Sequence, residues 1–110
     1  MGLEKAFQCE ITISLGVKEK LLKKHNIEVW EIEEAIYDDP YAFSIAHWDC
    51  YFIYGKAFSG RYLLILVRVL SPEETSKLGF KPGTNVIKII TARDMNKKQR
   101  KIYNKRRGIN

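Results

Sequence analysis

Residues 86–107, VIKIITARDMNKKQRKIYNKRR, pass from a strand pattern to a helix pattern without a break. The first half is rich in β-branched residues and is mostly apolar, which is typical of a strand. The second half carries apolar residues at helical spacing, and Asn96 is suited to cap the start of that helix. The stretch therefore predicts a final strand followed directly by a C-terminal helix over about residues 95–107.

This predicted helix is strongly basic, with six Lys or Arg side chains between Lys97 and Arg106. Within it, Arg100, Tyr103 and Arg107 are spaced i, i+3, i+7, so they share one helix face. Two guanidinium groups beside a phenol suit phosphate groups and an unstacked base. The alternative is a solvated basic helix that only improves solubility.

The net charge of +6 is distributed very unevenly along the 110 residues. Residues 1–92 have a net charge of −1, whereas residues 93–110 have a net charge of +7. This pattern favours an anionic partner: nucleic acid first, an acidic protein second and a membrane surface third. The length predicts one domain over residues 1–110. Because no apolar run is long enough to span a bilayer and no signal peptide opens the chain, we expect a cytoplasmic protein.

The two cysteines, Cys9 and Cys50, fit a reduced protein with buried thiols, and we expect no metal and no cofactor. Together with the two histidines, their spacings do not make a zinc site. Cys9 falls on the apolar side of an alternating segment over residues 7–15, in which Phe7 and Leu15 face the same way. Packing is therefore favoured over reactivity for Cys9.

Periodicity and turn residues predict the rest of the order β-α-α-β-β-β-α. The expected elements are a strand over 7–15, helices over 17–25 and 28–37, a hairpin of strands 51–57 and 61–70, a polar loop over 71–84, and the final strand and helix. We expect an α+β fold with a small antiparallel sheet of three or four strands and the two N-terminal helices on one face. The other face then has too few helices to cover it, which predicts an exposed concave surface or a partner.

Residues 41–49 show no clear period, although their large apolar side chains favour burial. His47 and Trp48, next to Asp49, would either line a site or form a capped corner of the core, and we favour the core corner. Arg68 is the one charge in a nearly apolar strand, and we expect it at the end of the sheet or on an open face.

Two other clusters allow a functional and a structural interpretation. Lys24 and His25 fall in the last turn of the first helix, where cations favour the helix dipole. In the functional interpretation, His25 is a proton-transfer group beside a phosphate. Asp38 and Asp39 precede a proline at a helix end, which is typical of turn formers rather than of acid–base or metal chemistry.

Three short motifs occur in order along the chain. They are Lys24-His25-Asn26-Ile27 followed by Asp39-Pro40, then a strand ending at Gly55 with a Gly60-Arg61 turn and an apolar strand, and finally Ile90-Thr91-Ala92-Arg93 followed by Gln99-Arg100 and Tyr103. In this order and spacing they resemble the BrnT family of type II toxins, which are small ribonucleases with a RelE/ParE-like fold. The resemblance covers most of residues 10–106.

The chain departs from the family pattern at several positions. Asn26 replaces a Gly, Gln99 replaces a Glu, Asp49 and Cys50 replace a Glu and an Arg, Asp94 and Met95 replace a basic and a small residue, and the loop at 71–84 is longer. The resemblance therefore supports the expected fold more strongly than it supports the expected catalytic residues.

The resemblance implies cleavage of RNA phosphodiester bonds without a metal, which would inhibit translation. Such cleavage needs activation of the ribose 2′-hydroxyl, stabilisation of negative charge on the phosphate and protonation of the leaving 5′-oxygen. The catalytic set that we predict is Arg93 for the phosphate, His25 as the base near neutral pH, Arg100 and Tyr103. The phosphate-binding set is Lys24, Arg61, Lys97, Lys98, Lys101, Lys105 and Arg107. The structural alternatives are that Arg93 caps or pairs with a helix carboxylate, that Tyr103 is core, and that the lysines are simply solvated.

The resemblance also implies a cognate antitoxin, a small dimeric DNA-binding protein whose acidic or amphipathic segment would block the RNA site. A homodimer or a toxin–antitoxin heterotetramer is the expected assembly. Three hypotheses stay open: a toxin ribonuclease, a non-catalytic nucleic-acid-binding module, and a protein-interaction subunit whose basic helix binds an acidic partner.

Overall fold

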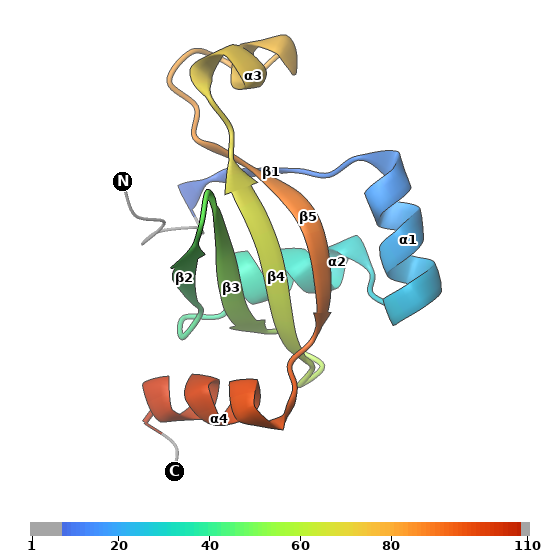
Figure 1. The fold of residues 1–110 in the computed structure, drawn as a ribbon, viewed down its shortest axis with the longest axis vertical. Coiled ribbons are helices and arrows are strands. Elements are labelled where there is room, and N and C mark those ends of the chain that lie inside the picture. Colours follow the sequence, from blue (N-terminus) through green and yellow to red (C-terminus); the bar gives the residue numbers. More distant parts are fainter. Residues whose placement is uncertain (1–7, 109–110) are drawn as a thin grey trace.

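A computed structural model describes residues 8–108 and shows a five-stranded mixed sheet with α-helices packed on it (Figure 1). The sheet order is β1-β5-β4-β3-β2, where β1 is parallel to β5 and the other neighbours are antiparallel. The strands are β1 (Glu10–Thr12), β2 (Phe43–His47), β3 (Cys50–Lys56), β4 (Tyr62–Val69) and β5 (Val86–Asp94). The helices are α1 (Leu15–His25), α2 (Val29–Glu33) continued by a π-helical turn η2 (Glu34–Asp38), α3 (Pro72–Lys77) and α4 (Lys97–Arg106).

The α+β class is confirmed, whereas the prediction of three or four antiparallel strands is wrong. The additional strand β2 lies within residues 41–49, which show no clear hydrophobic period. It pairs with β3, and the two-residue connection Trp48–Asp49 joins the two strands. It is an edge strand and is only half covered, so its residues do not alternate cleanly between apolar and polar. Trp48 is 92% exposed, which overturns the predicted core corner.

The first strand is shorter than the alternation predicts and runs parallel to β5. It covers only Glu10–Thr12, and Leu15 is exposed at the start of α1 instead of facing the core. Phe7 lies outside the described residues. Cys9 is partly buried against the core, as expected, and burial raises the pKa of its thiol. Alternation marks a half-buried strand but carries no information on its direction.

The loop predicted over residues 71–84 contains the short helix α3. Ser71 caps it by accepting a hydrogen bond from the backbone N–H of Glu74 at 3.2 Å, and Glu74 returns a bond to Ser71 N–H. Pro72 occupies the first helical turn. These are the features of a capping box, so the sequence did carry the signal of a helix start.

The caps of the two long helices confirm their prediction. Asn26 ends α1 in the left-handed conformation with φ of +52°. Asn96 begins α4, accepting from Gln99 N–H at 2.8 Å, while the Gln99 side chain accepts from Asn96 N–H at 3.0 Å. This reciprocal pair fixes where β5 gives way to α4.

The main core lies between one face of the sheet and the helices α1, α2 and η2, as predicted for the N-terminal helices (Figure 1). It is formed by Leu21, Ile27, Ile32, Ala35, Ile36, Ile53, Leu63, Ile65, Val67, Ile87, Ile89 and Ala92. Gly55 lets η2 approach β3 closely, because a Cβ atom there would overlap the backbone oxygen of Ala35.

A second, smaller core lies under α4 on the opposite face. There Tyr103 and Met95 pack on Tyr54 and Leu64. Helix α4 therefore covers only the end of this face at which β5 finishes (Figure 1). Within residues 8–108 no helix covers the middle of this face, where Phe52 and Leu66 are partly exposed (Figure 1).

Candidate nucleic-acid interface

The strand register sorts the uncovered sheet face into rows of side chains. In the row farthest from α4, His47 pairs with Cys50, and Arg68 pairs with Lys88. The middle row is Ile45, Phe52, Leu66 and Thr91, and the row nearest α4 ends at Arg93, opposite Leu64. We call the first two rows together with Arg93 the open face.

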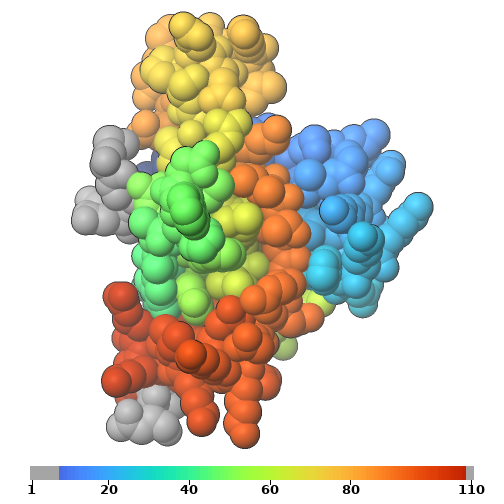
Figure 2. All heavy atoms as spheres, in the orientation of Figure 1, coloured from blue at the N-terminus to red at the C-terminus, as the bar shows by residue number. Residues whose placement is uncertain are grey.

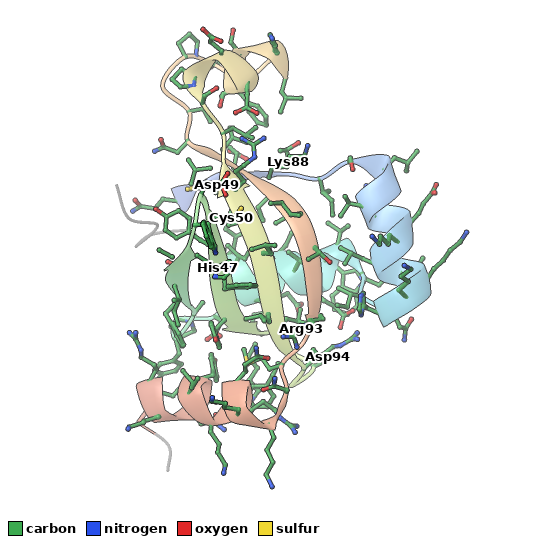
Figure 3. The ribbon with its side chains drawn as sticks, in the orientation of Figure 1. His47, Asp49, Cys50, Lys88, Arg93 and Asp94 are labelled. Carbon is green, nitrogen blue, oxygen red and sulfur yellow. The ribbon has the colours of Figure 1, made fainter. Side chains whose placement is uncertain are left out.

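The open face combines apolar and aromatic groups in its middle with charged groups at its ends. Thr91 and Arg93 are exposed, Ile45 is 38% exposed, and Phe52 and Leu66 are partly exposed. In Figure 2, atoms of β4 are visible between those of the β2–β3 hairpin and those of β5, above α4. Figure 3 places His47, Cys50 and Lys88 toward one end of the sheet and Arg93 at the other, beside α4.

Arg93 lies at the seam between β5 and α4, as its position in the sequence predicts. Its guanidinium donates from Nη1 to the Gln99 side-chain oxygen at 3.3 Å and to the Asp94 carbonyl at 3.2 Å. Both acceptors are neutral, and Arg93 forms no ion pair within residues 8–108. The side chain is exposed, so its positive charge is positioned but not neutralised.

The cationic side chains of α4 extend this positive surface. None of them forms an ion pair with another residue between 8 and 108. The exposed ones are Lys97, Lys98, Arg100, Lys101, Lys105 and Arg106. The guanidinium of Arg106 lies 4.5 Å from the ring centroid of Phe43, and that of Arg107 lies 5.1 Å from the ring centroid of Tyr41. These cation–π contacts hold two of the cations without cancelling their charge.

Tyr103 lies in the second core and is 1% exposed. Its hydroxyl donates to the Asp39 carboxylate at 2.6 Å, and burial followed by this contact raises the pKa of the phenol well above its usual range. Of the two roles left open by the sequence, the structure shows core packing, so the ring is not available to stack on a base. Tyr103 and Arg107 do line a common hollow of about 240 Å³, but neither Arg93 nor Arg100 borders it.

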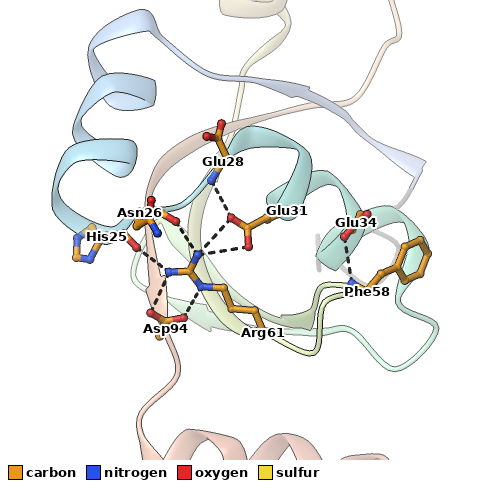
Figure 4. A network of polar contacts seen from close by, with 8 residues as sticks. All are labelled: His25, Asn26, Glu28, Glu31, Glu34, Phe58, Arg61 and Asp94. Atoms are coloured by element: carbon orange, nitrogen blue, oxygen red, sulfur yellow. Dashed lines mark hydrogen bonds and ion pairs between the residues drawn. The ribbon is translucent and has the colours of Figure 1, made fainter.

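Arg61 occupies a closed network of hydrogen bonds rather than a phosphate site (Figure 4). Its guanidinium contacts both carboxylate oxygens of Asp94 at 2.7 and 3.1 Å, the buried Glu31 at 3.2 Å, and the carbonyl oxygens of His25 and Asn26. These bonds tie β4, β5, α1 and α2 together. The predicted phosphate-binding role of Arg61 is corrected accordingly, because its donors are already occupied.

His25 and Lys24 lie at the end of α1, apart from the open face. The His25 ring points away from the Arg61 guanidinium (Figure 4). Hydrogen bonds from Arg61 lower the pKa of Asp94, and the charge of His25 adds a smaller effect in the same direction. Arg93 and Asp94 are consecutive in a strand, so their side chains leave β5 on opposite faces. The structure therefore does not bring His25 against Arg93, and Lys24 is exposed on the helix side.

The far end of the open face contains charged groups outside the predicted set. Arg68 binds Glu74 of α3 with two hydrogen bonds of 3.0 and 2.7 Å, which lower the pKa of Glu74 to about 2. Lys88 lies beside Arg68, and the Cys50 thiol, 3.6 Å from Asp49, has a pKa raised mainly by burial. Arg68 is the only charge in β4, and Lys88 is the only charge in the apolar first half of β5, which was the signal for this end of the face.

Sequence comparisons leave the chain without a demonstrated relative: no protein-family model and no curated protein matches it. Between residues 8 and 108, no three His, Cys, Asp or Glu side chains are grouped so as to hold a metal ion. No helix in this described part has the length and apolar character needed to cross a bilayer.

Proposed function

We propose that this protein is the toxin of a type II toxin–antitoxin pair, a cytoplasmic, metal-independent endoribonuclease that binds single-stranded RNA across the open face and α4. The observation that carries the proposal is Arg93, an exposed cation with no carboxylate partner, held where the open face meets the most basic helix of the chain. The motif resemblance to BrnT toxins supports the same activity.

The distribution of groups suits a single strand better than a duplex. Lys97, Lys98 and Arg100 begin α4 beside Arg93, so they are positioned to neutralise successive phosphates. Phe52 and the neighbouring aliphatic side chains of the middle row offer an apolar surface to unpaired bases, which a duplex hides. At the cleaved bond, Arg93 would stabilise the extra negative charge of the phosphate in the transition state.

A second candidate, an RNA-binding module that does not cut, is favoured by a specific observation. Within residues 8–108 no histidine forms a hydrogen bond with Arg93, because His25 lies on the helix side of β5 and His47 lies at the opposite end of the open face. The Tyr103 hydroxyl donates its hydrogen bond to Asp39 instead. Cleavage needs a proton acceptor for the 2′-hydroxyl. The two candidates therefore differ in turnover and not in where RNA binds.

The proposed partner is an antitoxin whose acidic or amphipathic segment competes for the same cationic surface. Such a segment would complement Arg93 and the unpaired cations of α4. A homodimer or a toxin–antitoxin heterotetramer is the proposed assembly.

The deciding experiment incubates labelled RNA with the wild-type protein, Arg93→Ala and Lys20→Ala in the presence of a chelator. Lys20 is exposed on α1, away from the open face, and serves as the control for loss of one cation. Cleavage by the wild type and Lys20→Ala but not by Arg93→Ala is the expected result. Salt-sensitive binding of RNA that stays intact would exclude the ribonuclease and support the RNA-binding module. Absence of RNA binding at physiological salt would exclude both of these functions and support a protein-interaction subunit.

A further inference from the structure

Trp48 occupies the tip of the β2–β3 hairpin in an unusual way. Its indole side chain is 92% exposed, and its backbone has a φ of +58°, in the left-handed region. It is one of two residues other than glycine with a positive φ between residues 8 and 108, and the other is the helix-capping Asn26.

Both properties are unfavourable for folding. The left-handed conformation is strained for a bulky side chain and is normally left to Gly or Asn. A fully exposed indole also keeps a large apolar surface in water and gains no packing in return. The two-residue hairpin connection requires a positive φ at its first residue, and Gly or Asn would meet that requirement without strain. A bulky, exposed indole at this position therefore points to a binding role for the ring.

Two aromatic side chains of the open face lie close to Trp48 in the chain. His47 precedes it, and the His47 ring lies 5.1 Å from the ring of Phe52 in the middle row. Trp48 follows His47 at the hairpin tip, and the contact between His47 and Phe52 leads from there toward the centre of the open face. We call these three residues the aromatic strip.

The charges around the aromatic strip differ from those around Arg93. Arg68 forms an ion pair with Glu74. The remaining charges at this end are the positive Lys88 and the negative Asp49, which is next to Trp48 in the chain (Figure 3). This end of the face thus has aromatic surface without excess positive charge. It suits the π-face of a base and not a phosphate.

We propose that Trp48 is a stacking subsite for an unpaired base of the single-stranded RNA whose phosphates bind Arg93 and α4. This inference rests on the proposed function and adds a base-binding subsite to the phosphate-binding part of the same RNA site. Arg93 lies five residues along β5 from Lys88, which is in the same row as His47. That separation is about 16 Å along the strands, and the hairpin tip lies about 12 Å from β5 across the sheet. The distance from the seam to the aromatic strip is therefore about 20 Å, which about six stacked nucleotides span.

The experiment uses a single-stranded 2′-O-methyl RNA of about eight nucleotides, long enough for that span and unable to be cut through its 2′-oxygen. In the full chain carrying Trp30→Phe, Trp48 is the only tryptophan. We expect saturable quenching of its fluorescence by this RNA and none by the matching duplex. Polyglutamate serves as the acidic-protein probe, and quenching by it alone would overturn the proposal in favour of a protein interface.

Affinity measurements on the same RNA separate this subsite from the phosphate site. Trp48→Ala should weaken binding about 5- to 150-fold, the range for loss of one stacked base, with the salt dependence unchanged. Trp30→Ala is the matched control, because Trp30 is 53% exposed but lies on α2, on the covered side of the sheet. Trp48→Gly should weaken binding equally with a melting temperature equal to or above that of the wild type, because glycine relieves the strain at this φ.

Equal affinities of Trp48→Ala and Trp30→Ala would overturn the stacking subsite and leave the proposed function standing. Absence of RNA binding by the wild type would overturn the proposed function and the subsite together.

Discussion

The Tyr103 hydroxyl donates a 2.6 Å hydrogen bond to the carboxylate of Asp39, 64 residues earlier in the chain. The same carboxylate accepts from the backbone N–H groups of Tyr41 at 2.9 Å and Lys56 at 2.8 Å. Asp39 thereby joins α4 to the turn after η2 and to the end of β3. This contact fixes which side of α4 faces the sheet, and it leaves the cations of the helix facing solvent.

We predict that Tyr103→Phe destabilises the protein without removing its RNA site. Loss of a hydrogen bond to a charged acceptor lowers the free energy of unfolding by about 1.5–3 kcal/mol. Urea denaturation measures this change, and Tyr62→Phe is the control because the Tyr62 hydroxyl makes only a 3.5 Å contact. Weaker RNA binding by folded Tyr103→Phe with unaltered stability would show instead that the phenol contacts RNA.

Gln99→Glu should separate the stability of α4 from its affinity for RNA. A carboxylate in the first turn of a helix stabilises it by about 0.3–1 kcal/mol. The same carboxylate would pair with Arg93, which already contacts the Gln99 oxygen at 3.3 Å, and would neutralise it. We expect weaker RNA binding and a salt-dependence slope smaller by about 0.7, the contribution of one phosphate contact on a single strand.

The control for this charge change is Asn85→Asp, which adds the same charge at the opposite end of β5. Equal losses of RNA affinity in the two variants would mean that only net charge matters and that Arg93 has no special position.

Arg61→Ala should be among the most destabilising substitutions of a charged residue. It leaves the carboxylate of Glu31, whose side chain is only 8% exposed, without its cation. Removing one partner of such a pair lowers the free energy of unfolding by about 3 kcal/mol. Arg68→Ala, which breaks a more exposed ion pair, should have a clearly smaller effect in the same denaturation experiment.

Alkaline pH should destabilise the protein through Tyr37. Its hydroxyl donates to the Cys9 carbonyl at 2.7 Å, and burial, reinforced by Glu10 and Glu33, raises its pKa from 10.0 to about 12. Since the folded pKa is above the unfolded one, this contribution is complete below pH 10 and is lost as the pH rises toward about 12. Thermal melts across this range should fall less steeply for Tyr37→Phe than for Tyr41→Phe, and equal slopes would exclude Tyr37 as the cause.

The sequence predicted an element best where the residues of that element alone contain both its hydrophobic period and its cap. The passage from β5 to α4 shows a change of period and a cap at Asn96, and both appear in the structure. The end of α1 at Asn26 was equally clear. By contrast, β2 is an edge strand without alternation, and the parallel direction of β1 depends on a partner 76 residues away. No local pattern reports either feature.

The site was predictable only in part for a related reason. The location of Arg93 at the seam was predictable, because it ends a strand that is followed directly by a basic helix. Helical spacing grouped Arg100, Tyr103 and Arg107 but did not say that Tyr103 would face the core. The network around Arg61 depends on contacts between four elements, and the residues of the open face come from four strands. Which residues of different elements come together depends on the strand register and on helix packing, and neither can be deduced from a local sequence pattern.

Binding of single-stranded RNA across the open face and α4 is tested most directly by titrating the ¹⁵N-labelled protein with 2′-O-methyl RNA and following the amide chemical shifts. We expect the perturbed residues to cluster on β4, on β5 around Arg93, on the start of α4 and at the β2–β3 hairpin tip, while α1 and α2 stay unchanged. Perturbations centred on α1 and α2, with Arg93 and its neighbours unaffected, would contradict the proposed RNA site.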